Sequence, residues 1–132
     1  MNVLLSIKPK YVDLITEKKK RYEFRKSVFR WQDISAKIYI YCSTPVRKII
    51  GFFTIEDILK DHPSHLWTQC KHASGIQEKD FFKYFENKNI GYAIKIGDLT
   101  IFDTPLDPKT IFPNFFPPQS FYYIDEIPNQ YS

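Results

Sequence analysis

Apolar and polar side chains alternate most strictly over residues 21–25, which read Arg-Tyr-Glu-Phe-Arg. A period of two is typical of a β-strand, because successive side chains point to opposite faces. Tyr22 and Phe24 would therefore face the core, while Arg21, Glu23 and Arg25 would share the other face. The segment predicts a strand with one aromatic face and one charged face.

Five further segments have the apolar runs or the alternation of strands: residues 3–8, 36–43, 47–58, 90–102 and 121–124. In residues 36–43 the isoleucines and the tyrosines would face opposite sides of the strand. A lone Gly51 would mark a bulge or a close approach of two backbones. Gly97 followed by Asp98 would allow a turn within residues 90–102.

Three segments have helical signals. The first begins at Pro9, because the missing N–H of proline is not needed in the first turn of a helix, and it ends in the charged residues 17–20. Its apolar face would consist of Tyr11, Leu14 and Ile15. Residues 61–70 predict a short second helix, and residues 78–86 predict a third. The third helix would turn inward the side chains of Phe81, Phe82 and Phe85.

Helices inserted between strands favour an α+β fold, namely a small mixed β-barrel of about five to seven strands flanked by two to three helices. No repeat, low-complexity tract or Gly/Ser-rich linker divides the chain, so residues 1–132 predict a single domain. The chain has no apolar run long enough to cross a membrane, and its start lacks the basic and apolar regions of a secretory signal. We therefore expect a cytoplasmic protein with no membrane association.

Positive charge is concentrated in the first third of the chain. The whole chain carries a formal net charge of +4, whereas residues 1–48 hold 12 Lys and Arg against 4 Asp and Glu. A local excess of this kind points to an anionic ligand, although a solvated lysine-rich face explains the same numbers. Phe, Tyr and Trp make up 17% of the residues and suit either a β core or the stacking of bases.

The densest polar cluster spans residues 18–25, where the first helix leads into a strand. Glu23 and Arg25 would project from the same strand face about 7 Å apart. One acid between basic residues is also the pattern of an ordinary ion-paired surface. Spacing alone leaves both interpretations open.

The chain resembles the ASCH domains of the PUA-like superfamily, in particular the small bacterial and phage type. Those domains carry a G-x-K-x-x-E-x-R motif after a strand and a helix. Lys20, Glu23 and Arg25 match its last three defined positions, and Lys18 stands where glycine is usual. Because lysine adopts a positive φ less readily than glycine, this departure puts the conformation of the turn in question. Other segments follow in the expected order, namely residues 4–9, 39–41, 45, 50–51, 67, 84–85, 92–94 and 117–121.

The resemblance implies a PUA-like barrel with a basic cleft beside the motif, and RNA or a modified nucleotide as its ligand. Lys20 and Arg25 would contact phosphate or polar base edges, and Glu23 would orient them or accept hydrogen bonds from a base. Such a module could act in the regulation of transcription or translation. Further candidates for the same cleft are Lys8, Ser43 and Thr44, which a solvated surface or a turn explains equally well.

Two enzymatic branches of the family give alternatives. One resembles amidohydrolases of N4-acylated cytidines, in which a lysine, a threonine and a glutamate are catalytic. Lys20 would be that lysine, but Glu23 stands at the position of the threonine and could act only as a general base. The other branch is linked to RNA cleavage, for which the motif offers no histidine. A regulator that binds only proteins is a third alternative, and of these we favour a binding module over an enzyme.

Four residues with metal-binding side chains, His62, His65, Cys70 and His72, lie within eleven positions. Zinc sites usually place their ligands as two short pairs separated by a spacer, and this spacing does not. We expect neither a metal nor another cofactor here. The two cysteines of the chain, Cys42 and Cys70, are expected to be reduced and buried.

The aromatic residues near the C-terminus allow two interpretations. They either close the barrel or line the cleft, and they comprise Phe112, Phe115, Phe116, Phe121, Tyr122 and Tyr123. Lys83 and Lys88 lie outside the basic first third and are expected to contribute nothing to anion binding.

Overall fold

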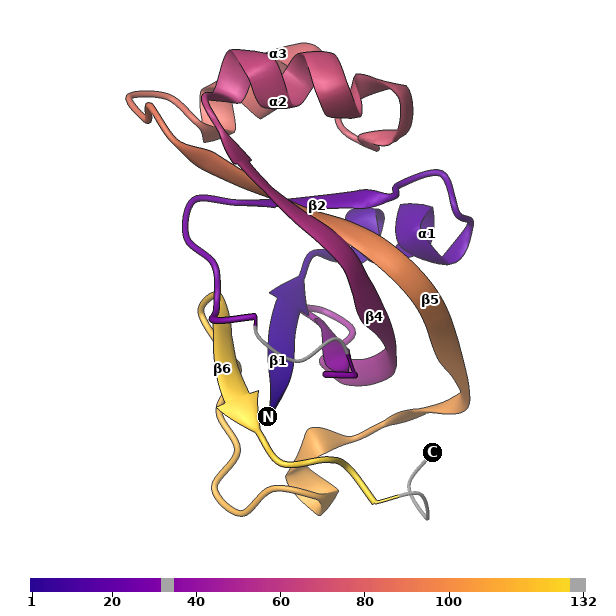
Figure 1. Cartoon of the computed structure of the whole chain (residues 1–132). Helices are drawn as coiled ribbons and strands as arrows, with labels where there is room; N and C mark the ends of the chain where they lie inside the picture. Colours follow the sequence, from indigo (N-terminus) through magenta and orange to yellow (C-terminus); the bar gives the residue numbers. More distant parts are fainter. Residues whose placement is uncertain (32–34, 129–132) are drawn as a thin grey trace.

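The computed structural model of the chain describes residues 1–31 and 35–128 (Figure 1). Its strands are β1 (Asn2–Ile7), β2 (Tyr22–Arg25), β3 (Ile38–Cys42), β4 (Lys48–Asp61), β5 (Gly91–Leu106) and β6 (Phe121–Ile124). Its helices are α1 (Pro9–Thr16), α2 (Pro63–Cys70) and α3 (Glu78–Tyr84), with short 3-10 turns at Lys71–Ala73 and Pro108–Thr110. Every predicted strand and helix is present, most with slightly different ends.

The six strands form one mixed sheet in the order β2-β5-β4-β3-β1-β6. β1 and β3 are parallel, and the other pairs are antiparallel. The long strands β4 and β5 curve strongly, so the sheet curls into a half-barrel (Figure 1). Among the described residues no ladder joins the edge strands β2 and β6. The predicted α+β class, strand number and helix number are confirmed, and the barrel is a half-barrel.

Two glycine positions lie where the pairing of β4 and β5 is irregular or close. A Cβ added at Gly51 would lie 2.1 Å from the carbonyl oxygen of Thr100, so the two backbones approach closely there, and the register shifts beside it. Both predicted roles of Gly51 are therefore present. The predicted turn at Gly97 and Asp98 is wrong, because β5 continues through it with an irregular register, and the backbone N–H of Asp98 donates to Thr54 Oγ1 at 3.1 Å.

Strand β3 is buried on both faces, as the alternation over residues 36–43 allows. Ile38, Ile40 and Cys42 belong to the first core cluster, while Tyr39 and Tyr41 belong to the second. The second cluster is completed by half-buried side chains of the C-terminal aromatic group, namely Phe112, Phe115 and Tyr122. Phe121 packs on the first cluster. This aromatic group therefore covers the curled sheet, with Phe116 and Tyr123 left exposed.

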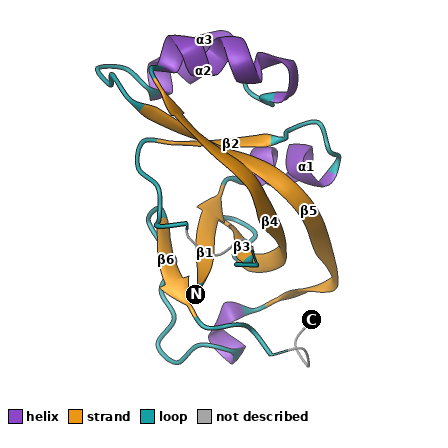
Figure 2. Ribbon diagram, viewed as in Figure 1, coloured by secondary structure: helices purple, strands orange, loops and turns teal. Residues whose placement is uncertain are grey.

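The helices occupy the predicted segments but differ in their buried faces. On α1 the buried residues are Val12 and Ile15, whereas Tyr11 and Leu14 are half-buried. On α3, Phe81 is buried, but Phe82 is 38% exposed because it lies a quarter turn away. α2 and α3 lie together beside the ends of β4 and β5 (Figure 2). In the described part of the chain no helix has the length and apolarity of a membrane span.

Candidate functional site

A cleft of about 850 Å³ runs along β2 between the half-barrel and α3. Five of the six residues predicted for the site line it, namely Lys8, Lys20, Glu23, Arg25 and Ser43. Thr44, the sixth, is exposed and does not line the cleft. The other lining residues come from distant segments: Ser6, Ile7, Lys10, Tyr11, Phe24, Lys26, Ser27, Ile76, Asp80, Lys83, Tyr84, Gln119 and Ser120.

The turn that delivers Lys20 to the cleft has the conformation expected of glycine. Lys18 has φ = 62°, in the left-handed region. The backbone N–H groups of Lys19 and Lys20 both donate to the carbonyl oxygen of Leu14, at 2.9 and 3.0 Å, which closes the end of α1. The lysine at the glycine position therefore leaves the turn intact.

Lys20, Glu23 and Arg25 form a buried ion cluster at the floor of the cleft. Arg25 Nη2 lies 2.7 Å from Glu23 Oε2, and Lys20 Nζ lies 3.9 Å from Glu23 Oε1. The three residues are only 2%, 6% and 9% exposed, respectively. The interpretation as an ordinary ion-paired surface is therefore wrong, since both faces of β2 are covered. Glu23 is held between two cations, an arrangement that orients both of them.

Arg25 also joins the two edges of the half-barrel. Its Nη2 donates to the carbonyl oxygen of Ser6 at 2.7 Å, and its Nη1 donates to Ser120 Oγ at 3.3 Å. Ser6 is in β1 and Ser120 immediately precedes β6, so a side chain of β2 bridges a seam that no ladder closes in the described part of the chain. The cleft opens on this seam, which places Ser120 in its lining.

Burial dominates the electrostatics of Lys20. Its Nζ donates to the carbonyl oxygen of Ser74 at 2.7 Å and lies about 5 Å from the ring centroids of Tyr11 and Phe24. Desolvation lowers the pKa of this amine, and the neighbouring Glu23 carboxylate offsets part of the effect by favouring the ammonium form. The Lys20 ammonium therefore loses its proton more readily than a lysine with the usual pKa.

We expect the Lys20 amine to titrate below 10.5, the usual pKa of a lysine. A bound anion favours the ammonium form, so it should raise this pKa, and anion affinity should fall as pH rises through the lowered pKa. Lysine 13Cε shifts followed over pH, with and without inorganic phosphate, would measure both effects. A Lys20 resonance that titrates at or above a pKa of 10.5 would contradict the expectation.

Exposed lysines surround the mouth of the cleft. Lys8, Lys10, Lys26 and Lys83 line it and are exposed, against a single exposed acid, Asp80. Lys83 was expected to lie outside the site and is instead part of it, because α3 packs beside the motif strand. Lys88 does not line the cleft. The buried floor and the lysine rim together make this cleft basic.

Among the four residues with metal-binding side chains, His62 and His65 lie beside each other with ring centroids 6.0 Å apart, but each pairs with a different side chain. His62 Nδ1 pairs with Ser64 Oγ at 2.9 Å, and His65 Nδ1 pairs with Asp61 at 3.1 Å. Cys70 is fully buried in the third core cluster, and the ring of His72 contacts the ring of Tyr22. Within residues 1–31 and 35–128 no three His, Cys, Asp or Glu side chains are grouped to hold a metal ion.

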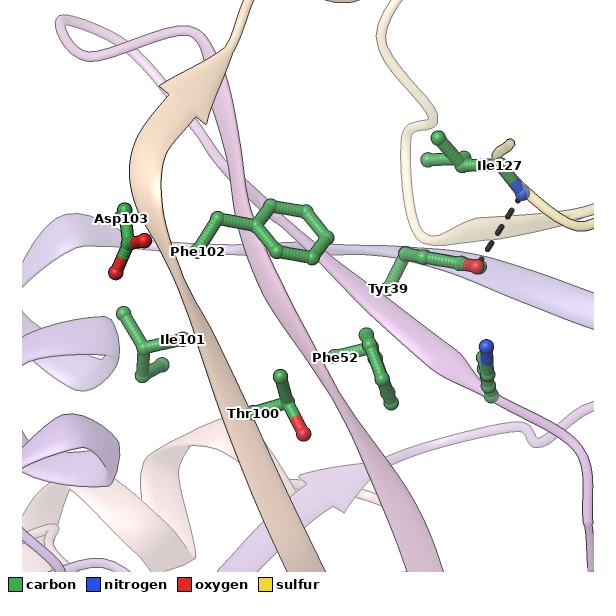
Figure 3. Close-up of a pocket in the computed structure, with 8 residues that line it drawn as sticks. Tyr39, Phe52, Thr100, Ile101, Phe102, Asp103 and Ile127 are labelled. Atoms are coloured by element: carbon green, nitrogen blue, oxygen red, sulfur yellow. Dashed lines mark hydrogen bonds between the residues drawn. The ribbon is translucent and has the colours of Figure 1, made fainter. Parts of the chain in front are cut away.

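A second, smaller cavity of about 220 Å³ lies against the aromatic side of β3, β4 and β5 (Figure 3). Tyr39, Phe52 and Phe102 line it, and Tyr39 Oη accepts a hydrogen bond from the backbone N–H of Ile127 at 3.2 Å. Its one lysine, Lys37, is paired with Glu126. None of the residues predicted for the site lines this cavity, so the cleft along β2 is the candidate functional site.

Sequence reasoning missed several residues of the cleft. Tyr11 was expected to pack in the core, and Lys26 and Tyr84 were not singled out for the site, yet all three line it. The basic run and the Pro-Pro-Gln-Ser-Phe segment were the available signals for Lys26 and Ser120. Nothing in the sequence places α3 beside β2, so Asp80 carried no signal of its own. Tyr84 was interpreted, with the phenylalanines of the same helix, as a core residue and not as a stacking platform.

Comparison with known proteins agrees with this architecture. The family described as a domain of unknown function, DUF365, matches residues 1–114. An ASCH domain-containing ribonuclease of Zymomonas mobilis subsp. mobilis is 31% identical over 123 residues, which cover 89% of this chain and 80% of that protein.

Crystal structures of the ASCH protein from Zymomonas mobilis have the same fold. One matches with a TM-score of 0.86 and 29% identity over 95% of this chain and 88% of the other. A tyrosine-to-phenylalanine variant of that protein matches with a TM-score of 0.85 and 28% identity over 95% and 91%. The chain belongs to the family described as DUF365 and is an ASCH domain protein.

Proposed function

We propose that this protein binds single-stranded RNA in the cleft along β2. The observation that carries the proposal is the charge arrangement of the cleft, in which four exposed lysines surround the buried cluster of Lys20, Glu23 and Arg25. Lysines at the rim suit the phosphates of a nucleic acid strand. Tyr11 and Tyr84 in the same lining offer rings on which bases can stack.

The size and depth of the cleft favour an unpaired strand over a duplex. Its volume of about 850 Å³ is that of a pocket for a small organic ligand, so it accommodates extruded nucleotides and not a double helix. Sequence-specific RNA recognition mostly uses unpaired bases, which stack on aromatic rings and expose their edges. A modified nucleotide would be held by the same groups.

RNA cleavage is a second candidate function. It is favoured by the name of the relative from Zymomonas mobilis, an ASCH domain-containing ribonuclease. Cleavage through the 2′-hydroxyl needs a group that takes its proton and cations that stabilise the charged phosphorane. No histidine lines the described cleft, so Lys20, Glu23 and Arg25 would have to supply these roles. The lowered pKa of Lys20 brings this amine closer to proton transfer at neutral pH.

Fluorescence anisotropy with a labelled single-stranded RNA hexamer tests the binding proposal. We expect measurable affinity at about 50 mM salt that falls steeply by about 200 mM, because binding releases counterions from the phosphates. Lys20→Ala is expected to weaken it. An affinity independent of salt, or equal for wild type and Lys20→Ala, would contradict the proposed site.

The same samples, analysed on denaturing gels, separate binding from catalysis. Fragments produced by the wild type and lost in Lys20→Ala would establish cleavage, and intact RNA would leave a binding module. Acetate released from N4-acetylcytidine would instead assign the cleft to an amidohydrolase.

We place the protein in the cytoplasm, in keeping with Cys42 and Cys70, which are both free thiols in the core.

A further inference from the structure

Helix α3 contributes one side to the core and an adjacent side to the cleft. Phe81 and Phe85, four residues apart, are 0% and 2% exposed and pack in the third core cluster. Asp80 and Tyr84, also four residues apart, are exposed and line the cleft. Side chains at this spacing are neighbours on one side of a helix. The buried phenylalanines thus hold the helix in place while Asp80 and Tyr84 form one wall of the cleft.

The ring of Tyr84 is positioned by its surroundings and accessible to a ligand. The ring of Phe85 meets it edge to face, with the centroids 4.8 Å apart, and Tyr84 remains 37% exposed. The ammonium of Lys26 lies over the ring, 4.7 Å from its centroid. Lys26 is exposed and has a flexible stem, so it can move aside. Tyr84 is therefore an aromatic platform covered by a movable cation.

A nucleobase can take the place of Lys26 on this platform. Stacking of a base on an aromatic side chain stabilises a complex more than an exposed cation–π contact does. The displaced ammonium stays at the rim of the cleft, where the phosphate of the same nucleotide needs a positive partner. After the exchange Lys26 is paired with a phosphate, and the base is stacked on the ring of Tyr84.

Asp80 provides a polar group beside the platform. Across residues 1–31 and 35–128 its carboxylate makes neither a hydrogen bond nor an ion pair. An ionised carboxylate only accepts hydrogen bonds, and its charge disfavours phosphate. Cytosine, adenine and guanine can donate to it from an exocyclic amino group. Uracil has no amino group, and its one donor, the N3–H, lies between two carbonyl oxygens that the carboxylate repels.

We propose that α3 reads the base: an unpaired base stacks on Tyr84 and donates its amino group to Asp80, so that uracil is disfavoured. This inference rests on the proposed binding of RNA in the cleft and adds a base preference to it. The lysine rim holds any RNA, whereas Asp80 and Tyr84 determine which base occupies the wall position.

Two labelled hexamers, oligocytidylate and oligouridylate, test the preference in anisotropy titrations. The wild type is expected to bind the cytidylate about 5-fold more tightly, as one charged hydrogen bond allows. Asp80→Asn should bring the ratio of the two affinities close to one. The ratio is informative because both hexamers carry the same phosphates, so the loss of a negative charge affects them equally. Asp103→Asn makes the same change at an exposed acid outside the cleft and should keep the preference.

Tyr84→Leu should lower the affinity for both hexamers about 10-fold. The salt dependence of binding should not change, because stacking and not charge is lost. Tyr84→Phe keeps the ring and should retain wild-type affinity. Phe82→Leu is the matched control, since Phe82 is exposed to a similar extent on the same helix but does not line the cleft.

The outcomes distinguish the base preference from RNA binding itself. Salt-dependent binding that is lost with Lys20→Ala, but is equal for the two hexamers and insensitive to Asp80→Asn and Tyr84→Leu, would overturn the base-reading role of α3 alone. Failure of both hexamers to bind the wild type would overturn the proposed function together with this inference. A preference for cytidylate that Asp80→Asn abolishes would establish the assignment.

Discussion

Alanine at Lys8, Lys10, Lys26 and Lys83 together is expected to lower the affinity for single-stranded RNA by at least about 100-fold at low salt. These four exposed lysines form the rim of the cleft, where phosphates of a bound strand must pass. Each phosphate contact on a single strand contributes about 0.7 to the slope of log affinity against log salt, so the slope should decrease by about 3. Anisotropy titrations at several salt concentrations measure both quantities.

The matched control removes the same charge elsewhere. Lys60, Lys71, Lys88 and Lys109 are exposed and do not line the cleft. Their combined replacement by alanine changes the net charge equally and should weaken binding only slightly. An equal loss from both quadruple variants would mean that RNA responds to the overall charge of the protein, and the localised site would be wrong.

Glu23→Gln is expected to lower the free energy of unfolding by about 3 kcal/mol, measured by urea denaturation. The change leaves the buried cations Lys20 and Arg25 without a counter-charge, and a buried charge without its partner is costly. The glutamine can still accept one hydrogen bond from Arg25, so the protein should remain folded. Inorganic phosphate should stabilise this variant more than the wild type, because an anion in the cleft replaces the missing charge.

Glu56→Gln is the corresponding control on an exposed ion pair. Glu56 lies 3.4 Å from Lys95, and both side chains are substantially exposed. Its loss is expected to change the free energy of unfolding by less than about 1 kcal/mol. A Glu23→Gln variant as stable as Glu56→Gln would show that the buried cluster is solvated or that Lys20 is uncharged.

Periodicity was sufficient to locate the strands and helices but not to orient every helix. The apolar stripe of α1 was placed on Tyr11, Leu14 and Ile15, whereas Val12 and Ile15 are the buried residues. Several stripes are possible on a short helix, and the one that faces the core depends on which strands the helix meets. Tyr11 is available to the cleft for this reason.

The alternation over residues 21–25 correctly separated the aromatic side chains of β2 from the charged ones. It could not show that the charged face is covered as well. That burial comes from the chain around Ser74, which accepts a hydrogen bond from Lys20, and from Ser6 and Ser120, which bind Arg25. All three lie at least 19 positions from the residue they contact. A local pattern contains no information about contacts of such separation.

The motif Lys20, Glu23 and Arg25 was recognisable because its members lie within one turn and one strand, where local geometry decides their proximity. Strand identity, the α+β class and the position of the basic cluster followed from the same short-range patterns. The cleft itself was decided by tertiary structure. Curvature of β4 and β5 brings α3 over β2, so Asp80 and Tyr84 lie across from a motif more than 50 residues earlier. Side-chain contacts between distant segments depend on how the sheet curls, which bulges and backbone approaches determine and which no local periodicity records.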